Sequence, residues 1–288
     1  MTLREEYRRS LKMPEAEEIF DLIFYRPAAF LFVKGIYPTE ITPNQITTLS
    51  LIAALLAAWQ FGTIHLATGA ALYALANILD CADGQLARLK KNGTLLGRVF
   101  DGAFDYLASI AIFIGIGISA AGMNQWWLVG LTGLSSGMHA LFFDHYQNEF
   151  ISIVRSERNF LEREMETFSQ EIASSKRGIR RSMLQLYLRY LGIQRKANTG
   201  EENPVFDPPV YRRKNSPMIR CWSFLGPTTN RTILIISALF GHIEYYLWTI
   251  TAAGNLWLVF CFSLQRQIHK QLAVSTPRDH PTRRIVDA

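Results

Sequence analysis

The chain has only three cysteines, and their positions exclude most cysteine-based chemistry. Cys81, Cys221 and Cys261 are too far apart in the sequence to form a zinc or redox motif. An odd number of cysteines in a cytosol-facing protein is most simply explained by free thiols. The charged N-terminus has no cleavable signal pattern, and the chain contains no nucleic-acid motif, internal repeat or low-complexity tract.

Hydrophobic residues make up 49% of the 288 residues, and they are concentrated in long runs. Most of these runs approach the roughly 20 residues that a helix needs to cross a bilayer. The fifth is short. The predicted membrane spans cover about 46–64, 66–86, 99–121, 126–144, 228–240 and 245–264. The expected fold is therefore an all-α integral membrane protein with six transmembrane helices.

Basic residues are missing from one set of connections between these spans. The segments 61–66, 121–125 and 241–244 contain no Lys or Arg, so all 30 basic residues fall on the opposite side. Because basic residues favour the cytoplasmic side, both termini are predicted to face the cytosol, most simply across a cell inner membrane. The net charge of +6 then reflects this bias and contact with anionic lipids, and no nucleic-acid partner is expected.

The spans divide the chain into four predicted regions. Residues 1–40 form an N-terminal segment with an amphipathic stretch over 13–34, interrupted at Arg26-Pro27. We predict an interfacial helix on the bilayer surface, and an ordinary soluble helix is the alternative. Residues 41–149 hold the first four spans, 150–227 form a cytosolic insert, and 228–288 hold the last two spans and a cytosolic tail.

The insert is predicted to be mainly helical. Val154, Leu161 and Phe168 recur every seven residues, which indicates a helical stripe with an interruption at Arg158. A second helix is predicted over 179–191, where apolar and basic residues alternate with a helical period. Residues 198–217 contain four prolines and are predicted to form a loop.

Four carboxylates occur near the ends of the second and third spans, where a membrane protein would normally avoid them. On one helix, Asp80 and Asp83 share an arc of roughly 140° with small residues and an arginine. On the next helix, Asp101 and Asp105 are four residues apart and share a face. If the two faces meet, the carboxylates need protons or cations to offset their repulsion. Hard divalent ions such as Mg²⁺ are the usual partners of all-oxygen sites.

The same stretch carries further fixed spacings. The pattern is D-x2-D-G-x2-A-R-x8-G-x3-D-x3-D, and it resembles the signature of the CDP-alcohol phosphotransferase (phosphatidyltransferase) family, integral membrane enzymes of phospholipid synthesis. Every fixed position is met, by Asp80, Asp83, Gly84, Ala87, Arg88, Gly97, Asp101 and Asp105. Solvated carboxylates on a cytosolic turn would leave the glycine and alanine positions unexplained.

The resemblance implies transfer of a substituted phosphate group from a CDP-linked donor to an acceptor hydroxyl, with release of CMP. It implies Mg²⁺ or Mn²⁺ as cofactor, with two ions the expected number. Asp80, Asp83 and Asp101 are the first-choice ligands, and Asp105 is shared between metal binding and proton abstraction. Gly84, Ala87 and Gly97 would let the nucleotide or a neighbouring helix approach closely. Arg88 could bond a phosphate or pair with the carboxylates.

Two further pairs of residues are weaker candidates. Asn44 and Thr47 lie in a turn that opens the first span, and in the family a similar Pro-Asn pair lies near the nucleotide; helix capping is the alternative explanation. Asp144 and His145 end the fourth span at about the depth of the motif and could contact the acceptor. His139, nearby, is equally explained as a packing residue.

The sequence leaves the substrates and the assembly open. CDP-diacylglycerol with a small polar or polyol acceptor, and a soluble CDP-alcohol with diacylglycerol, both fit, and the six-span size favours the first. A homodimer is compatible with these features. A divalent-metal transporter or channel is the alternative function, and a membrane-bound scaffold is a third. Only an enzyme would combine a carboxylate cluster with a metal-dependent contact to CMP or CDP.

Overall fold

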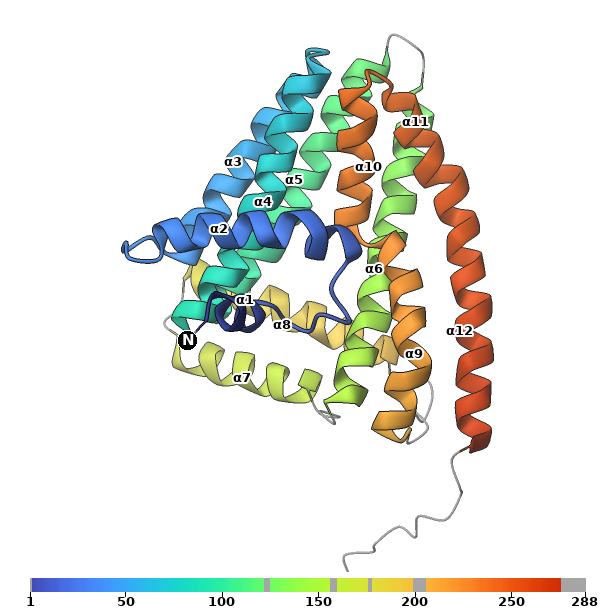
Figure 1. The fold of residues 1–288 in the computed structure, drawn as a ribbon. Coiled ribbons are helices and arrows are strands. Elements are labelled where there is room, and N and C mark those ends of the chain that lie inside the picture. Colours follow the sequence, from blue (N-terminus) through green and yellow to red (C-terminus); the bar gives the residue numbers. More distant parts are fainter. Residues whose placement is uncertain (1, 122–124, 156–159, 176–177, 199–205, 276–288) are drawn as a thin grey trace, which may run out of the picture.

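The computed structural model describes residues 2–121, 125–155, 160–175, 178–198 and 206–275, and all regular secondary structure within them is helical. This confirms the all-α prediction. Each of the six predicted spans falls on a helix (Figure 1). By length and hydropathy, three helical stretches could cross a membrane: Pro43–Gly62, Leu95–Ser119 and Ile243–Leu272.

Three long helices form the half of the molecule that carries the motif (Figure 1). They are α3 (Pro43–Gly62), α4 (Leu66–Lys90) and α5 (Leu95–Ala121). Small residues allow α3 and α5 to approach closely: a Cβ atom on Gly115 of α5 would lie 3.2 Å from the Cα atom of Ala58 on α3. With α4 packed against the same α3, the ends of α4 and α5 that carry carboxylates are held together.

The second half contains α6 (Trp126–Val154), α10 (Pro227–Leu239) and a long C-terminal element. That element runs without a break from α11 (Ile243–Trp248) through the π-helical turn η3 (Thr249–Gly254) into α12 (Asn255–Ser275). His139 of α6 is buried and hydrogen-bonds Asn255 at 3.1 Å. Its place between helices fits the packing role that the sequence left open for it.

The N-terminal segment differs in detail from the prediction. It contains α1 (Leu3–Ser10), the π-helical turn η1 (Asp21–Tyr25) and α2 (Arg26–Ile36), which crosses α4 (Figure 1). The expected interruption at Arg26-Pro27 is wrong. The π-helical turn η1 leads directly into α2 at Arg26, so the helix passes through Pro27 without a break.

Glu18 ties this N-terminal segment to α10. Its carboxylate is buried and accepts hydrogen bonds from the backbone N–H groups of Thr228 and Thr229, at 3.0 and 2.9 Å. These are unpaired donors of the first turn of α10, so Glu18 acts as its cap. A Cβ atom on Gly226 would overlap the carboxyl group of Glu18. Burial, followed by the charge of Asp21, raises the pKa of Glu18 to about 8.

The insert is more helical than predicted. It contains α7 (Phe160–Ser174), α8 (Ile179–Asn198), α9 (Pro208–Trp222) and the short turn η2 (Ser223–Leu225). Phe168 of the predicted stripe is buried, together with Leu184 of α8 and Val99 of α5. The pair α7–α8 therefore packs against the start of α5. The interruption predicted at Arg158 lies outside the described residues.

The loop predicted over 198–217 is wrong from Pro208 onward, where α9 begins. Pro208 and Pro209 occupy the first two helical positions, which tolerate proline. Pro217 lies inside the helix, but one face of α9 is buried and outweighs the hydrogen bond that proline removes. The buried residues are Tyr211, Asn215, Met218, Ile219 and Trp222.

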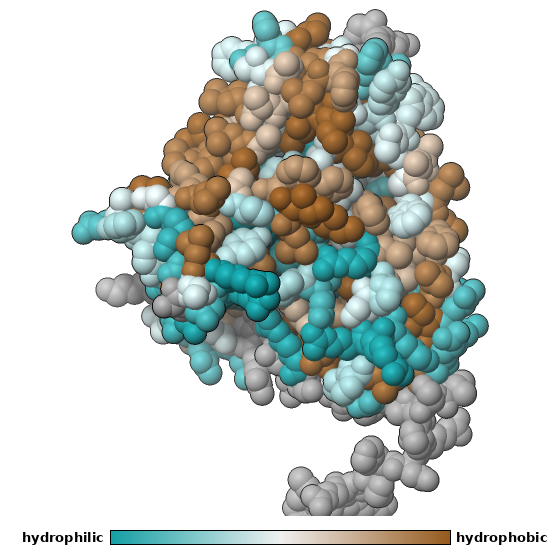
Figure 2. Space-filling view, in the orientation of Figure 1, coloured by the Kyte–Doolittle hydropathy of each residue, from teal (hydrophilic) through white to brown (hydrophobic). Residues whose placement is uncertain are grey.

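The surface has two distinct zones. Figure 2 shows hydrophobic side chains over the upper part of the molecule, where the long helices lie, and hydrophilic ones over the lower part. Large apolar side chains are exposed on α3 (Leu49, Ile52, Leu55, Leu56), on α5 (Ile110, Ile114, Ile118) and on α12 (Leu256, Val259, Phe260). Apolar surface of this extent is typical of helices that face lipid.

Candidate active site

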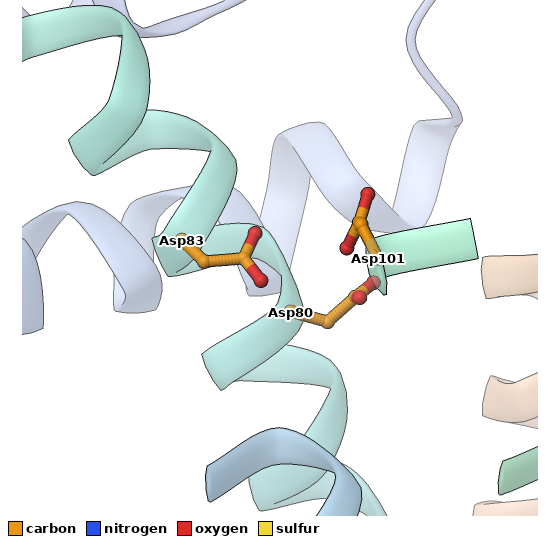
Figure 3. A group of neighbouring side chains, drawn as sticks. All are labelled: Asp80, Asp83 and Asp101. Atoms are coloured by element: carbon orange, nitrogen blue, oxygen red, sulfur yellow. The ribbon is translucent and has the colours of Figure 1, made fainter. Parts of the chain in front are cut away.

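Three of the four predicted carboxylates come together at the junction of α4 and α5. One oxygen each of Asp80, Asp83 and Asp101 lies within 4.8 Å of the others. Figure 3 shows the two side chains of α4 directed toward Asp101 of α5. Asp83 is buried, and the other two are partly exposed. The prediction that the two helix faces converge is confirmed for these three residues.

The local sequence explains why the two faces meet. Helix α4 ends at Lys90, and the next residue, Lys91, has a left-handed φ of 53° that turns the chain back on itself. Thr94 then accepts a hydrogen bond from the N–H of Gly97 at 2.9 Å and so caps the first turn of α5. Since only a few residues separate the helices, the end of α4 lies beside the start of α5.

Helix α3 supplies a second layer around the carboxylates. Thr42 and Gln45 form a reciprocal capping box at its first turn, as the sequence suggested for Thr42. Thr47 donates its hydroxyl proton to Asp83 Oδ2 at 2.6 Å, which fixes the orientation of this carboxylate. A Cβ atom on Gly97 would lie 2.6 Å from Asn44 Oδ1, so this glycine leaves room for the Asn44 side chain. Both weak candidates therefore lie at the site.

Asp105 lies apart from the group of three and is paired with an arginine. Arg231 of α10 donates from Nη2 to Asp105 Oδ1 at 2.8 Å and from Nη1 to Asp80 Oδ2 at 3.2 Å. Nη1 also donates to Asn77 Oδ1 at 2.9 Å. The guanidinium thus joins α4, α5 and α10 at the end of the site farther from the α4–α5 turn.

The sequence analysis treated Arg231 only as one of the basic residues, at the start of a span, and did not place it in the site. An arginine among apolar residues at membrane depth usually has a carboxylate partner, so its sequence context did indicate an ion pair. The sequence spacing does not identify which carboxylate is the partner. The partners are 126 and 151 residues away in the sequence.

The side chain of Arg88 packs against the backbone of Gly84, one turn earlier on the same helix. A Cβ atom on Gly84 would lie 3.4 Å from both terminal nitrogens of Arg88, so the glycine lets the guanidinium lie flat against the helix. Arg88 Nε donates to the carbonyl of Ser10 at 2.5 Å, and one terminal nitrogen is buried without a hydrogen-bond partner in the described part of the chain. The sequence left phosphate binding and pairing with the carboxylates open for Arg88; in the structure its described hydrogen bond goes to the backbone of Ser10, and a phosphate contact stays a prediction. Ala87, the remaining motif residue, is only partly buried on the same helix.

Asp144 and His145 are not part of the group of three carboxylates, although the charge of Asp105 acts on Asp144. Both are exposed on α6, and the ring of His145 packs edge-on against Tyr146 at 5.0 Å between centroids. Among the described residues, no hydrogen bond or ion pair links either one to the carboxylates. Their contact with an acceptor stays a prediction.

The residues of the site fit a hard divalent cation. Three carboxylates converge within 4.8 Å, and Arg231 reaches only the Asp80 side of the group. Asp83 and Asp101 have no cationic hydrogen-bond partner in the described part of the chain, although Asp83 is buried. Carboxylates held this close require positive charge, and oxygen ligands of this kind suit Mg²⁺ or Mn²⁺.

Comparison with known proteins agrees with this site. The family model described as CDP-alcohol phosphatidyltransferase matches residues 40–161, which include α3, α4 and α5. The bifunctional IPC transferase and DIPP synthase of Rubrobacter xylanophilus is 37% identical over 82 residues, which are 28% of this chain and 19% of that protein.

Two archaeal relatives match longer stretches. The archaetidylinositol phosphate synthase of Pyrococcus horikoshii is 32% identical over 36% of this chain and 55% of its own length. The protein of the same name from Methanothermobacter thermautotrophicus is 33% identical over 44% of this chain and 63% of its own length. The chain thus spans less than two thirds of each of these relatives. Over the matched residues, and in its intact motif, the chain is similar to proteins of the CDP-alcohol phosphatidyltransferase family.

Proposed function

We propose that this protein is a membrane-embedded phosphotransferase. It moves a substituted phosphate group from a CDP-linked donor to an acceptor hydroxyl and releases CMP. The observation that carries this proposal is the convergence of Asp80, Asp83 and Asp101 within an intact eight-position motif. When bound, one or two divalent ions would offset the charge of the donor pyrophosphate and of the departing CMP.

The residues around the carboxylates have distinct tasks in this proposal. Thr47 holds Asp83 in the orientation of a metal ligand. Gly97 leaves room for the Asn44 side chain beside the carboxylates, and Arg88, which has one buried terminal nitrogen without a partner in the described part of the chain, is proposed to bind a phosphate of the donor. Asp105, outside the group of three, accepts the proton of the acceptor hydroxyl as general base.

The donor is proposed to be a CDP-linked lipid such as CDP-diacylglycerol, and the acceptor a polar polyol phosphate. The support for the acceptor is the name of the relatives, several of which are archaetidylinositol phosphate or phosphatidylinositol phosphate synthases.

The first test is a substrate panel. Purified protein in lipid nanodiscs is incubated with Mg²⁺, CDP-diacylglycerol or a soluble CDP-alcohol, and either a polyol phosphate or diacylglycerol. We expect CMP release only with CDP-diacylglycerol and the polyol phosphate, and its loss on addition of EDTA. Release only from the soluble CDP-alcohol with diacylglycerol would reverse the proposed donor and acceptor. Absence of CMP release from every pair of substrates would contradict the proposed phosphotransferase activity.

A divalent-metal channel is the competing function. A channel would need acidic groups along a continuous path across the membrane. Beyond the carboxylates, toward the membrane, the guanidinium of Arg231 binds Asp80 and Asp105 and opposes the passage of a divalent cation. This contact favours the enzyme.

We further propose that six helices span the membrane with the site and both termini in the cytosol, and that α2 lies at the interface. The turn at Lys91 should then be cytosolic and the turn at His242 external, and both residues are exposed. In intact cells, a membrane-impermeant maleimide should label a His242→Cys protein but label Lys91→Cys only after permeabilisation. The unsubstituted protein, whose Cys81 and Cys261 are buried, gives the background. Labelling of both variants from outside would refute this topology.

A further inference from the structure

Arg231 lies outside residues 40–161, the part of the chain that the family model matches, yet it contacts two carboxylates of the motif. Its side chain is only 12% exposed. Each terminal nitrogen has its own acidic partner, Asp80 for Nη1 and Asp105 for Nη2. Asn77 fixes the same guanidinium from α4, and it is itself buried. Arg231 is therefore held in a fixed position by several hydrogen bonds, unlike the arginine of an exposed surface ion pair.

The position of Arg231 divides the four carboxylates into two sets. Asp83 and Asp101 lie nearer the α4–α5 turn, and the guanidinium does not reach them. Asp80 and Asp105 lie one helical turn farther from it and share the guanidinium. Asp80 belongs to both sets, because it is also part of the metal-binding group. Asp80 is therefore the residue that both a bound metal ion and Arg231 would contact.

We propose that Arg231 is the resident counter-cation of Asp80 and Asp105. One divalent ion binds to Asp80, Asp83 and Asp101 with Arg231 in place. A second ion binds at Asp105 only when it displaces the guanidinium. This inference rests on the proposed function, because it takes the carboxylates as metal ligands.

The charges and geometry support a displacement. Mg²⁺ binds carboxylate oxygens at about 2.1 Å, and an ion that close to Asp105 Oδ1 would lie only a few ångströms from a guanidinium nitrogen 2.8 Å from the same atom. Two cations so close repel each other strongly in a partly desolvated site. Two divalent ions would also match the four carboxylates in charge, which leaves the guanidinium surplus. Once displaced, Arg231 is available to the phosphates of the donor.

The consequence is ordered loading of the two ions. The site binds the first ion with high affinity. Its affinity for the second ion is lower, because this ion must break two charge-assisted hydrogen bonds of Arg231. Donor phosphates that accept hydrogen bonds from the released guanidinium would raise the affinity for the second ion. Arg231 thereby links occupancy of the second metal position to the presence of the donor.

The test is a Mn²⁺ titration of the protein in nanodiscs, with free Mn²⁺ counted by electron paramagnetic resonance. In the unsubstituted protein, we expect the second Mn²⁺ ion to bind with an affinity at least about tenfold lower than the first. Arg231→Gln should raise the affinity for the second ion by about tenfold or more, because the competing cation is gone. Arg231→Lys keeps a cation at this position, so its affinity for the second ion should stay low. The matched control is Arg212→Gln, which removes an exposed arginine from a carboxylate, Glu15, far from this motif in the sequence, and should leave both ions unchanged.

An unchanged second ion in Arg231→Gln would overturn the inference. The same titration of Asp101→Asn separates this result from failure of the proposed function. If Asp101→Asn loses an ion and Arg231→Gln titrates like the unsubstituted protein, only the role of Arg231 is wrong. If Asp101→Asn binds as many ions as the unsubstituted protein, the carboxylates are not the metal ligands, and both proposals fail.

A second measurement needs no substitution. Phenylglyoxal modifies accessible guanidinium groups, and mass spectrometry of peptides locates the products. Saturating Mn²⁺ should increase modification of Arg231 several-fold, because the guanidinium leaves its carboxylates, and it should not change modification of Arg212. Equal or lower modification of Arg231 with Mn²⁺ would contradict displacement.

Discussion

The Asp101→Asn protein is expected to fold normally and to release no measurable CMP. Asparagine keeps the shape of the side chain but removes the charge from one of the three converging carboxylates. The site would then bind a divalent ion poorly, and the charge on the donor pyrophosphate would not be offset. We expect a loss of turnover of at least about 10²–10³-fold, the range found when a major electrostatic contribution to a transition state is removed.

The fold should tolerate this change because Asp101 makes no hydrogen bond or ion pair with the described residues, and one of several repelling charges is removed. CMP release and circular dichroism of the purified protein test the two statements together. Asp207→Asn is a suitable control, since Asp207 is exposed before α9 and its side chain caps no helix. Near-normal turnover by a well-folded Asp101→Asn protein would show that Asp101 is not an essential ligand.

The second large effect should distinguish a general base from a metal ligand. Asp105 lies outside the group of three, so Asp105→Asn should lower turnover by about 10²–10⁴-fold through loss of proton transfer. Its affinity for CDP with Mg²⁺ should fall much less than that of Asp80→Asn, because only the weaker second ion is proposed to bind at Asp105. Asp80→Asn should weaken that binding directly, because Asp80 belongs to the group. Titration calorimetry of CDP at fixed Mg²⁺ compares the two proteins.

Equal losses of CDP affinity in the two variants would instead assign Asp105 chiefly to metal binding. The acceptor proton would then need another base. His145 would be the next residue to test, although its imidazole is exposed on α6 and has no described contact with the carboxylates.

The centre of the site could be predicted from the sequence because its determinants are local. Helical periodicity puts Asp80 and Asp83 on one face, and a short turn brings Asp101 beside them. Thr47 was only a weak candidate, placed by the family resemblance near the nucleotide, and its hydrogen bond to Asp83 of α4 was not predicted. For the three carboxylates, the partners follow from spacing within a single helical hairpin.

The contacts missed from the sequence are those between distant segments. The choice of Arg231 for Asp105 and of Glu18 for the start of α10 depends on how helices pack, which spacing does not specify. Helix α9 was missed for a related reason: its prolines weaken the local helical signal, while burial of Tyr211 and Trp222 against other helices stabilises it. Tertiary packing outweighed local propensity in each of these places.

The distance in sequence between Arg231 and its partners also has a consequence for synthesis. Arg231 leaves the ribosome 151 residues after Asp80 and 126 residues after Asp105. At typical elongation rates of about 5–20 residues per second, roughly 8–30 s pass between Asp80 and Arg231. During that interval, the nascent hairpin of α4 and α5 holds four carboxylates without the guanidinium, so protons or cations from the surrounding solution must balance them until α10 is inserted.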